Sequence, residues 1–194
     1  MPIPPFSTTD NVLPPYVGIN PGQHSDLMSP YKVGVPEVVS RFSTSPERKA
    51  ILAGWLQHRQ AIRAIGLRRG FQWLDGSFME DRGVPPGDID VVTFFHRPTD
   101  HRTNTLFHPF WNTHYHALFD RNTVRVAYHV DLFPVDLNGS PEAIVSISRY
   151  LLQLFSHQRV TGVWKGMLEV RLEDNAEDAS LLAGLTVPAA VVGP

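Results

Sequence analysis

The run Asp88–Phe95 (DIDVVTFF) constrains the fold more than any other stretch of the chain. After its two aspartates it is almost continuously apolar and rich in β-branched and aromatic residues, a composition typical of a β-strand. A strand that is apolar on both faces is buried on both sides and needs other elements to cover each face. With 42% hydrophobic residues, the chain can supply that cover and form a core.

Hydrophobic periodicity and capping residues predict helices and strands on either side of this run. Helical spacing predicts helices from Ser45-Pro46 to about Gly66, over 104–119, and from Ser140-Pro141 onward. Further strands are predicted over 71–74, 124–133 and 166–172, and a short continuation of the second of these holds Asp136. This order predicts an α/β fold in which helices cover a mixed sheet.

The N-terminal part of the chain differs from the rest in its proline content. Prolines crowd residues 1–36, where they remove helical hydrogen bonds and are unsuited to a central strand. We therefore predict that residues 1–40 form an extended arm, which lies over the domain or serves as a polyproline ligand for another protein. Residues 41–194 have about the size of one domain.

Charge and composition exclude several classes of protein. Seventeen Lys and Arg against 19 Asp and Glu give a net charge of −2, so contact with nucleic acid would need a local patch. One such patch is a basic outer surface predicted on the first long helix, with Arg48, Lys49, Arg59 and Arg63. The absence of cysteine excludes disulfides, thiol nucleophiles and thiolate zinc sites.

The same composition gives an expectation for the compartment. The N-terminus lacks the basic and apolar segments of a secretory signal. No apolar run approaches the roughly 20 residues that span a bilayer. We expect a cytoplasmic protein without a membrane partner.

Two aspartates at the start of the predicted buried strand form a candidate metal site. Side chains alternate along a strand, so Asp88 and Asp90 project to the same side. Two adjacent negative charges repel unless a cation neutralises them or one takes a proton, and ligands that are all oxygen favour Mg²⁺ or Mn²⁺. Asp131, on a later strand, is the preferred third carboxylate, and Asp136 is the alternative. In a straight strand these two would face opposite ways.

Gly76 and Ser77 follow a predicted strand and suit the binding of phosphate. Glycine permits close approach of the backbone, and amides and a hydroxyl supply hydrogen-bond donors. A third carboxylate would complete a site for two metal ions, which can hold the attacking and leaving oxygens of a displacement at phosphorus. The combination predicts phosphoryl or nucleotidyl transfer.

The order of these motifs resembles the nucleotidyltransferase superfamily, which includes DNA polymerase β, antibiotic nucleotidyltransferases and the minimal nucleotidyltransferases of bacterial toxin–antitoxin pairs. Residues 73–95 and 130–132 carry this resemblance. Over most of its length the chain also looks like a bacterial family of small nucleotidyltransferase-like proteins, through the motifs LPP at 13–15, RFSTSP at 41–46, LDGSF at 74–78, GDIDVV at 87–92 and DLFP at 131–134.

The resemblance implies a fold, a reaction and roles for the candidate residues. It implies the nucleotidyltransferase fold, with Asp88, Asp90 and Asp131 binding Mg²⁺ or Mn²⁺ and with Gly76 and Ser77 holding the β- and γ-phosphates of a nucleoside triphosphate. The implied enzyme transfers a nucleoside monophosphate to an acceptor hydroxyl and releases pyrophosphate. A tRNA, a protein or a small molecule is the acceptor, and a toxin–antitoxin or defence setting would add a partner protein.

The chain departs from the pattern of the minimal members in one place. Many of them carry an arginine shortly after Gly-Ser, whereas here Phe78–Asp81 separate Ser77 from Arg82. The missing positive charge has three candidates: Arg82, Arg121 and Arg125. Of these, Arg82 is the residue that we assign to nucleotide binding. The alternative function is a catalytically idle member of the fold that acts as an antitoxin, a regulator or a nucleotide sensor.

Overall fold

A mixed five-stranded sheet forms the centre of the protein in the computed structural model, which describes residues 2–20, 22 and 27–186. The strands lie in the order β1-β5-β2-β3-β4, with β2 antiparallel to β3 and β5, and with the pairs β1/β5 and β3/β4 parallel. Their bounds are β1 Tyr31–Lys32, β2 Gly70–Asp75, β3 Ile89–Phe95, β4 Val130–Asp136 and β5 Leu168–Arg171. The predicted α/β fold with a mixed sheet is confirmed, and β3 has a neighbour on each side.

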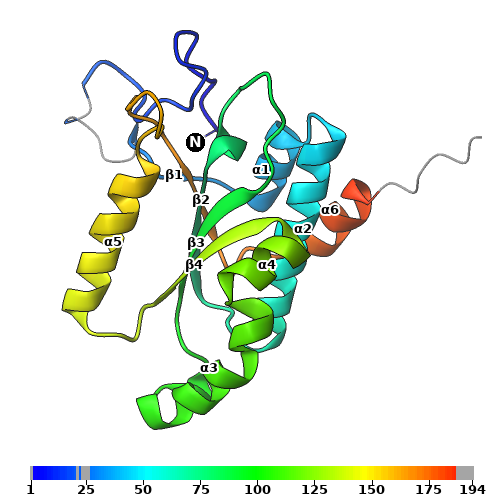
Figure 1. Ribbon diagram of the computed structural model, residues 1–194, viewed down its shortest axis with the longest axis vertical. Helices are drawn as coiled ribbons and strands as arrows, with labels where there is room; N and C mark the ends of the chain where they lie inside the picture. The colour runs from blue at the N-terminus through cyan, green and yellow to red at the C-terminus, as the bar shows by residue number, and fades with distance from the viewer. Residues whose placement is uncertain (1, 21, 23–26, 187–194) are drawn as a thin grey trace, which may run out of the picture.

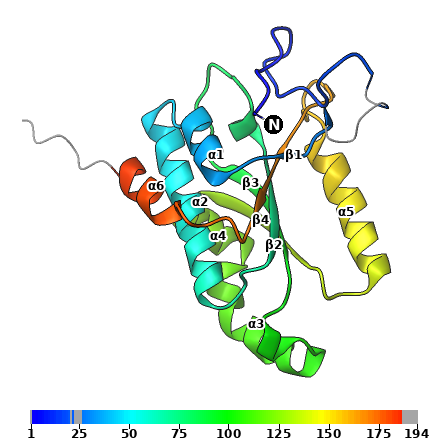
Figure 2. The same cartoon turned by 180° about the vertical axis from the view of Figure 1, so that it is seen from behind.

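Helices cover the two faces of this sheet unequally. Figures 1 and 2 show α1, α2, α4 and α6 on one face, α5 on the other, and α3 extending from one end. The bounds are α1 Val35–Phe42, α2 Pro46–Ala64, α3 Asn104–Leu118, α4 Arg121–Tyr128, α5 Pro141–Phe155 and α6 Asp178–Leu185, with short 3-10 helices η2 Ser77–Met79 and η3 Thr99–His101. No helix in the described part of the chain is long and apolar enough to cross a membrane.

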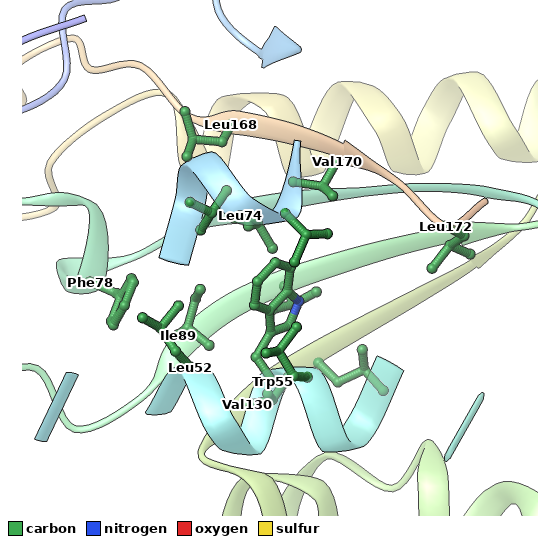
Figure 3. Packing of buried hydrophobic residues seen from close by; sticks show 14 of the residues in the cluster. Leu52, Trp55, Leu74, Phe78, Ile89, Val130, Leu168, Val170 and Leu172 are labelled. Atoms are coloured by element: carbon green, nitrogen blue, oxygen red, sulfur yellow. The ribbon is translucent and has the colours of Figure 1, made fainter. Parts of the chain in front are cut away.

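The helix α2 supplies the centre of the main core. Leu52 and Trp55 are fully buried and point toward Leu74 of β2 and Val170 of β5 (Figure 3). The Trp55 indole N–H donates to Gln72 Oε1 on β2 over 3.0 Å, so its polar edge is also satisfied. This hydrogen bond fixes α2 against β2, the strand that leads to Gly76 and Ser77.

The prediction that Arg59 lies on a basic outer surface of this helix is wrong, because Arg59 is fully buried. Its guanidinium donates to Gln72 Oε1 over 3.0 Å, to the Asp174 carbonyl over 2.7 Å and to Asp178 Oδ2 over 3.3 Å. A buried charge is tolerated when its donors are paired in this way. Arg59 thereby joins α2 to β2 and to the segment that leads into α6.

The strand predicted over 124–133 begins only at Val130, because 121–128 form α4. Asp120 caps this helix by accepting a hydrogen bond from the Thr123 amide. Val124 is buried but Val126 is 84% exposed, so the alternating apolar residues do not mark one face of a strand. His129, with φ of 55°, reverses the chain between α4 and β4.

The predicted arm is only partly extended. It contains β1 and most of α1, which crosses the expected boundary at residue 40. Pro36 is compatible with α1 because it lies in the first turn, where no helical N–H bond is lost. Leu13 and Tyr31 are buried, and the Tyr31 hydroxyl donates to the Pro14 carbonyl over 2.7 Å, so the described arm packs on the domain. Residues 1, 21, 23–26 and 187–194 of the predicted arm and domain lie outside the described residues.

Replacing Gly54 by alanine tests how closely α2 packs on α4. The new Cβ would lie 2.0 Å from the Tyr128 carbonyl oxygen. We expect the free energy of unfolding to fall by about 1–3 kcal/mol because backbone must move. Gly184→Ala in α6 is the matched control: its Cβ meets nothing within 4 Å, and helix propensity should make it neutral or stabilising by up to about 1 kcal/mol. Urea denaturation measures both, and equal effects would contradict the close packing.

Candidate active site

Three aspartates occupy matching positions on three neighbouring strands. Asp75 on β2 is opposite Asp90 on β3, and Asp90 is opposite Asp131 on β4. Residues directly opposite each other on paired strands share a face of the sheet, so the three carboxyl groups form a row at one end of it. Asp88, immediately before β3, adds a fourth acid beside the row, since its charge acts on Asp90.

A pocket of about 350 Å³ lies over this row. Its size falls within the range of small-molecule sites. It is lined by all six residues predicted from the sequence, namely Gly76, Ser77, Arg82, Asp88, Asp90 and Asp131. Asp136, the alternative third carboxylate, lies elsewhere: it is opposite Phe95 at the far end of β3 and pairs with Arg97 over 2.7 Å.

The bend at Gly76 brings the backbone against Asp90. Gly76 has a φ of +85°, a backbone conformation that residues other than glycine rarely adopt. A Cβ there would also lie 2.5 Å from Asp90 Oδ2. Ser77 follows as the first residue of η2 and lines the same pocket. Glycine is therefore needed both for the turn and for the close approach to the carboxylate.

Two arginines of α4 partly neutralise the acidic row. Arg121 donates to both carboxylate oxygens of Asp131, at 2.5 Å for Nη2 to Oδ2. Arg125 Nε lies 2.7 Å from Asp88 Oδ2. Their spacing of one helical turn puts both side chains on the same face of α4. The strand predicted for 124–133 would not have brought them to the pocket together.

The acids of the row differ in their affinity for protons. Burial raises the pKa of Asp90 to about 6, and the negative charges of Asp131 and Asp88 act in the same direction. Burial also raises the pKa of Asp131, but hydrogen bonds and charge from Arg121 outweigh it and the net pKa is lowered. Asp90 therefore has less compensating positive charge than Asp131.

The buried side chain of Lys165 lines the pocket and contacts two of its acidic residues. Lys165 Nζ lies 3.2 Å from Asp75 Oδ1, 3.0 Å from Glu80 Oε1 and 3.2 Å from the Gly76 carbonyl oxygen, to which it donates. Burial raises the pKa of Asp75 to about 7, although Lys165 acts to lower it. Burial also acts to raise the pKa of Glu80, but Gln158 and Lys165 bring it below its usual value.

Lys165, Asp75 and Glu80 were not predicted as site residues. Asp75 could have been found, because it belongs to the LDGS motif and antiparallel pairing of β2 with β3 puts it opposite Asp90. Lys165 gives no such signal: it lies in the loop before β5, and only the folded chain brings it to the pocket.

The acidic row fits a divalent cation in its chemistry. Asp88, Asp90 and Asp131 offer only oxygen donors, the ligands that Mg²⁺ and Mn²⁺ prefer. Asp88 Oδ2 is buried and, among the described residues, has no aligned hydrogen-bond partner. Across residues 2–20, 22 and 27–186, however, no three acidic or histidine side chains are arranged as ligands of one ion. A cation at Asp131 and Asp88 would compete with Arg121 and Arg125, which pair with these carboxylates.

Sequence comparison assigns the chain to a family. It belongs to a family of unknown function (DUF6932), whose model matches residues 4–171. This range runs from the N-terminal arm to the end of β5 and includes every residue that lines the pocket, whereas α6 lies beyond it. No curated protein and no solved structure matches the chain.

Lys165→Met tests whether the lysine compensates the buried acids. The variant leaves Asp75 and Glu80 without their cation, and breaking a buried ion pair from one side costs about 3–5 kcal/mol of unfolding free energy. Lys32→Met, at an exposed position of β1, should change that free energy by less than about 0.5 kcal/mol. Urea denaturation gives both values, and a loss below about 1 kcal/mol for Lys165→Met would show that the acids do not depend on it.

The raised pKa of Asp90 predicts the pH dependence of stability. Between its usual value of 3.8 and about 6, the native state holds a proton that the unfolded chain has lost, so unfolding free energy falls as pH rises through this window. We expect the unfolding free energy of the native protein, minus that of Asp90→Asn, to decrease over that window and to level off above it. Denaturation in EDTA measures both free energies, and a difference that is the same at every pH would contradict the raised pKa of Asp90.

Proposed function

We propose that the protein is a nucleotidyltransferase, built on the fold of that superfamily and acting in the cytoplasm. In this proposal it moves a nucleoside monophosphate group from a nucleoside triphosphate to an acceptor hydroxyl and releases pyrophosphate. The observation that carries the proposal is the convergence of Asp88, Asp90 and Asp131 on one pocket, beside the bend at Gly76 and Ser77.

Asp88, Asp90 and Asp131 are the residues that would hold the divalent cation. When bound, Mg²⁺ or Mn²⁺ supplies charge neutralisation at the phosphoryl oxygens. Gly76 lets the backbone approach a phosphate closely, and Ser77 offers a hydroxyl donor at the same place. Catalysis would consist mainly of positioning and electrostatic stabilisation.

The arginines of α4 have a second role in this proposal. Once released from Asp131 and Asp88, Arg121 and Arg125 remain on the wall of the pocket, where a guanidinium can bind phosphate oxygens in a bidentate manner. Arg82 lines the same wall, although its Nε pairs with Glu80. Asp131 would accept the proton of the acceptor hydroxyl, because a general base must lie within hydrogen-bond reach of it.

A second candidate function is nucleotide binding without transfer, as in an antitoxin, a regulator or a nucleotide sensor. The observation that favours it is the engagement of the charged groups with one another: Arg121 with Asp131, Arg125 with Asp88 and Arg82 with Glu80. These pairs neutralise Asp131, Asp88 and Glu80 without a metal ion. A protein that kept them while binding a nucleotide would leave only Asp90 of the three proposed cation ligands without an ion pair among the described residues.

Pyrophosphate release tests the transfer reaction. The native protein is incubated with Mg²⁺ and each nucleoside triphosphate, alongside Asp88→Ala/Asp90→Ala, which should reduce the rate by about 100-fold or more. Asp10→Ala/Glu142→Ala removes two exposed carboxylates away from the pocket and should leave the rate unchanged. Equal rates in the native protein and Asp88→Ala/Asp90→Ala would contradict the enzymatic role.

Thermal stability with the same ligands separates the two candidate functions. A ligand that binds the native state raises the unfolding temperature. A rise with Mg²⁺ and a triphosphate, together with pyrophosphate release, supports transfer. The same rise without turnover supports nucleotide binding alone, and no rise with any triphosphate contradicts both.

A further inference from the structure

A second pocket, of about 560 Å³, lies at the opposite end of β3 from the acidic row. It is formed by two segments, 66–69 after α2 and 96–102 after β3, together with Asn138. A strand rises by about 3.3 Å per residue, so Asp90 and His96 are separated by about 20 Å. The two pockets are therefore distinct sites.

Arginine dominates the lining of this basic pocket. Arg68, Arg69, Arg97 and Arg102 all contribute to it, against one acidic lining residue, Asp100. Arg68, Arg69 and Arg102 are exposed, and none of the three makes an ion pair within the part of the chain that the structure describes. Since the whole chain carries a net charge of −2, this positive charge is a local feature.

Hydrogen bonds of the fold hold these arginines around one space. The His96 amide donates to the Arg69 carbonyl over 2.9 Å, which fixes the two segments against each other. The Arg97 guanidinium pairs with Asp136 over 2.7 Å and lies 4.4 Å from the centre of the Phe107 ring. It also donates to the Arg102 carbonyl over 3.1 Å. These bonds hold the two segments that carry the four arginines at one pocket.

The guanidinium groups that line the pocket favour a ligand with phosphate groups. A guanidinium presents a planar set of donors that matches phosphate oxygens, and like charges held together are stabilised by a multivalent anion. Among the described residues that line the pocket, His96 is the only aromatic side chain, so the pocket has no row of aromatic rings on which successive nucleic-acid bases could stack. The arginines surround a concavity of the size of small-molecule sites, which favours a compact ligand over an extended strand.

We propose that this basic pocket binds a compact anion that carries two or more phosphate groups. The proposal does not depend on the transfer reaction, because the two pockets share no lining residue. The ligand is either free polyphosphate or the phosphate chain of a nucleotide, and binding would engage the exposed Arg69 and Arg102, while Arg97 stays paired with Asp136.

Calorimetric titration of the full chain with inorganic tripolyphosphate tests the proposal. EDTA is present, so that no divalent cation can recruit the anion to the acidic row. We expect saturable binding at one site. Arg69→Gln/Arg102→Gln should weaken it by about 100-fold or more, since each substitution removes a charge-assisted contact to the anion.

Two control variants remove the same amount of charge elsewhere. Lys32→Gln/Arg149→Gln changes exposed positions on β1 and α5, and Arg82→Gln/Arg159→Gln removes positive charge from the acidic pocket. Both should bind tripolyphosphate within about twofold of the native protein, because surface charge far beyond the Debye length is screened. Arg69→Lys/Arg102→Lys keeps the charge but not the bidentate geometry and should bind with intermediate affinity; it also serves if the glutamine variant does not fold.

The identity of the ligand is resolved by competing probes. Orthophosphate should bind more weakly than tripolyphosphate. ATP binding more tightly than tripolyphosphate would indicate the nucleotide source, and weaker binding of ATP would indicate free polyphosphate. Absence of saturable binding, orthophosphate binding as tightly as tripolyphosphate, or an equal loss in the Lys32/Arg149 variant would overturn the proposal. Tighter binding of a mixed-sequence RNA strand through Arg69 and Arg102 would overturn the assignment of a compact ligand.

Discussion

The burial of the neighbouring carboxyl groups of Asp75, Asp90 and Asp131, together with the repulsion between their charges, is the constraint on which the candidate active site depends. The pairing of β2 with β3 and of β3 with β4 sets these acids side by side, and the backbone hydrogen bonds of the sheet prevent them from separating. Their charge must therefore be compensated by other groups. Lys165 compensates Asp75 in part and Arg121 compensates Asp131, while burial keeps the pKa of both Asp75 and Asp90 raised. The proposed cation would complete this compensation where the protein's own side chains leave it incomplete.

The same strand links two pockets of opposite character. At its beginning, β3 contributes Asp90 to the acidic row, and just beyond its end Arg97 belongs to the basic pocket. Asp136 belongs to this second end, where it neutralises Arg97 and fixes its guanidinium. The net charge of −2 conceals this separation, because the positive and negative residues nearly cancel in number. A nucleotide-processing site and a polyphosphate site on one sheet would give the protein two separate ways to recognise phosphate.

Much of the sheet and of the acidic row could be predicted from local patterns. The apolar run of β3 and the alternation of Asp88 with Asp90 depend only on neighbouring residues, and they identify the strand and the direction of its acids. Contacts between distant segments could not be predicted in this way. Nothing near Lys165 indicates that it approaches Asp75. Arg59 is one helical turn from Trp55, on the side of α2 that the fold buries, and its charge alone favoured the exposed position predicted for it. The α4 segment misled the strand prediction because Val124 and Val126 alternate as they would in a strand.

Diffraction from crystals grown with Mn²⁺ tests the central claim most directly, because the anomalous signal locates the ion and the electron density locates the side chains. The claim predicts an anomalous peak within coordination distance of Asp90 and at least one of Asp88 and Asp131, about 2.0–2.3 Å for oxygen ligands. It also predicts that Arg121 and Arg125 have moved away from these carboxylates. A saturating Mn²⁺ concentration that left no peak at the acidic row, with both arginines still in their ion pairs, would contradict it.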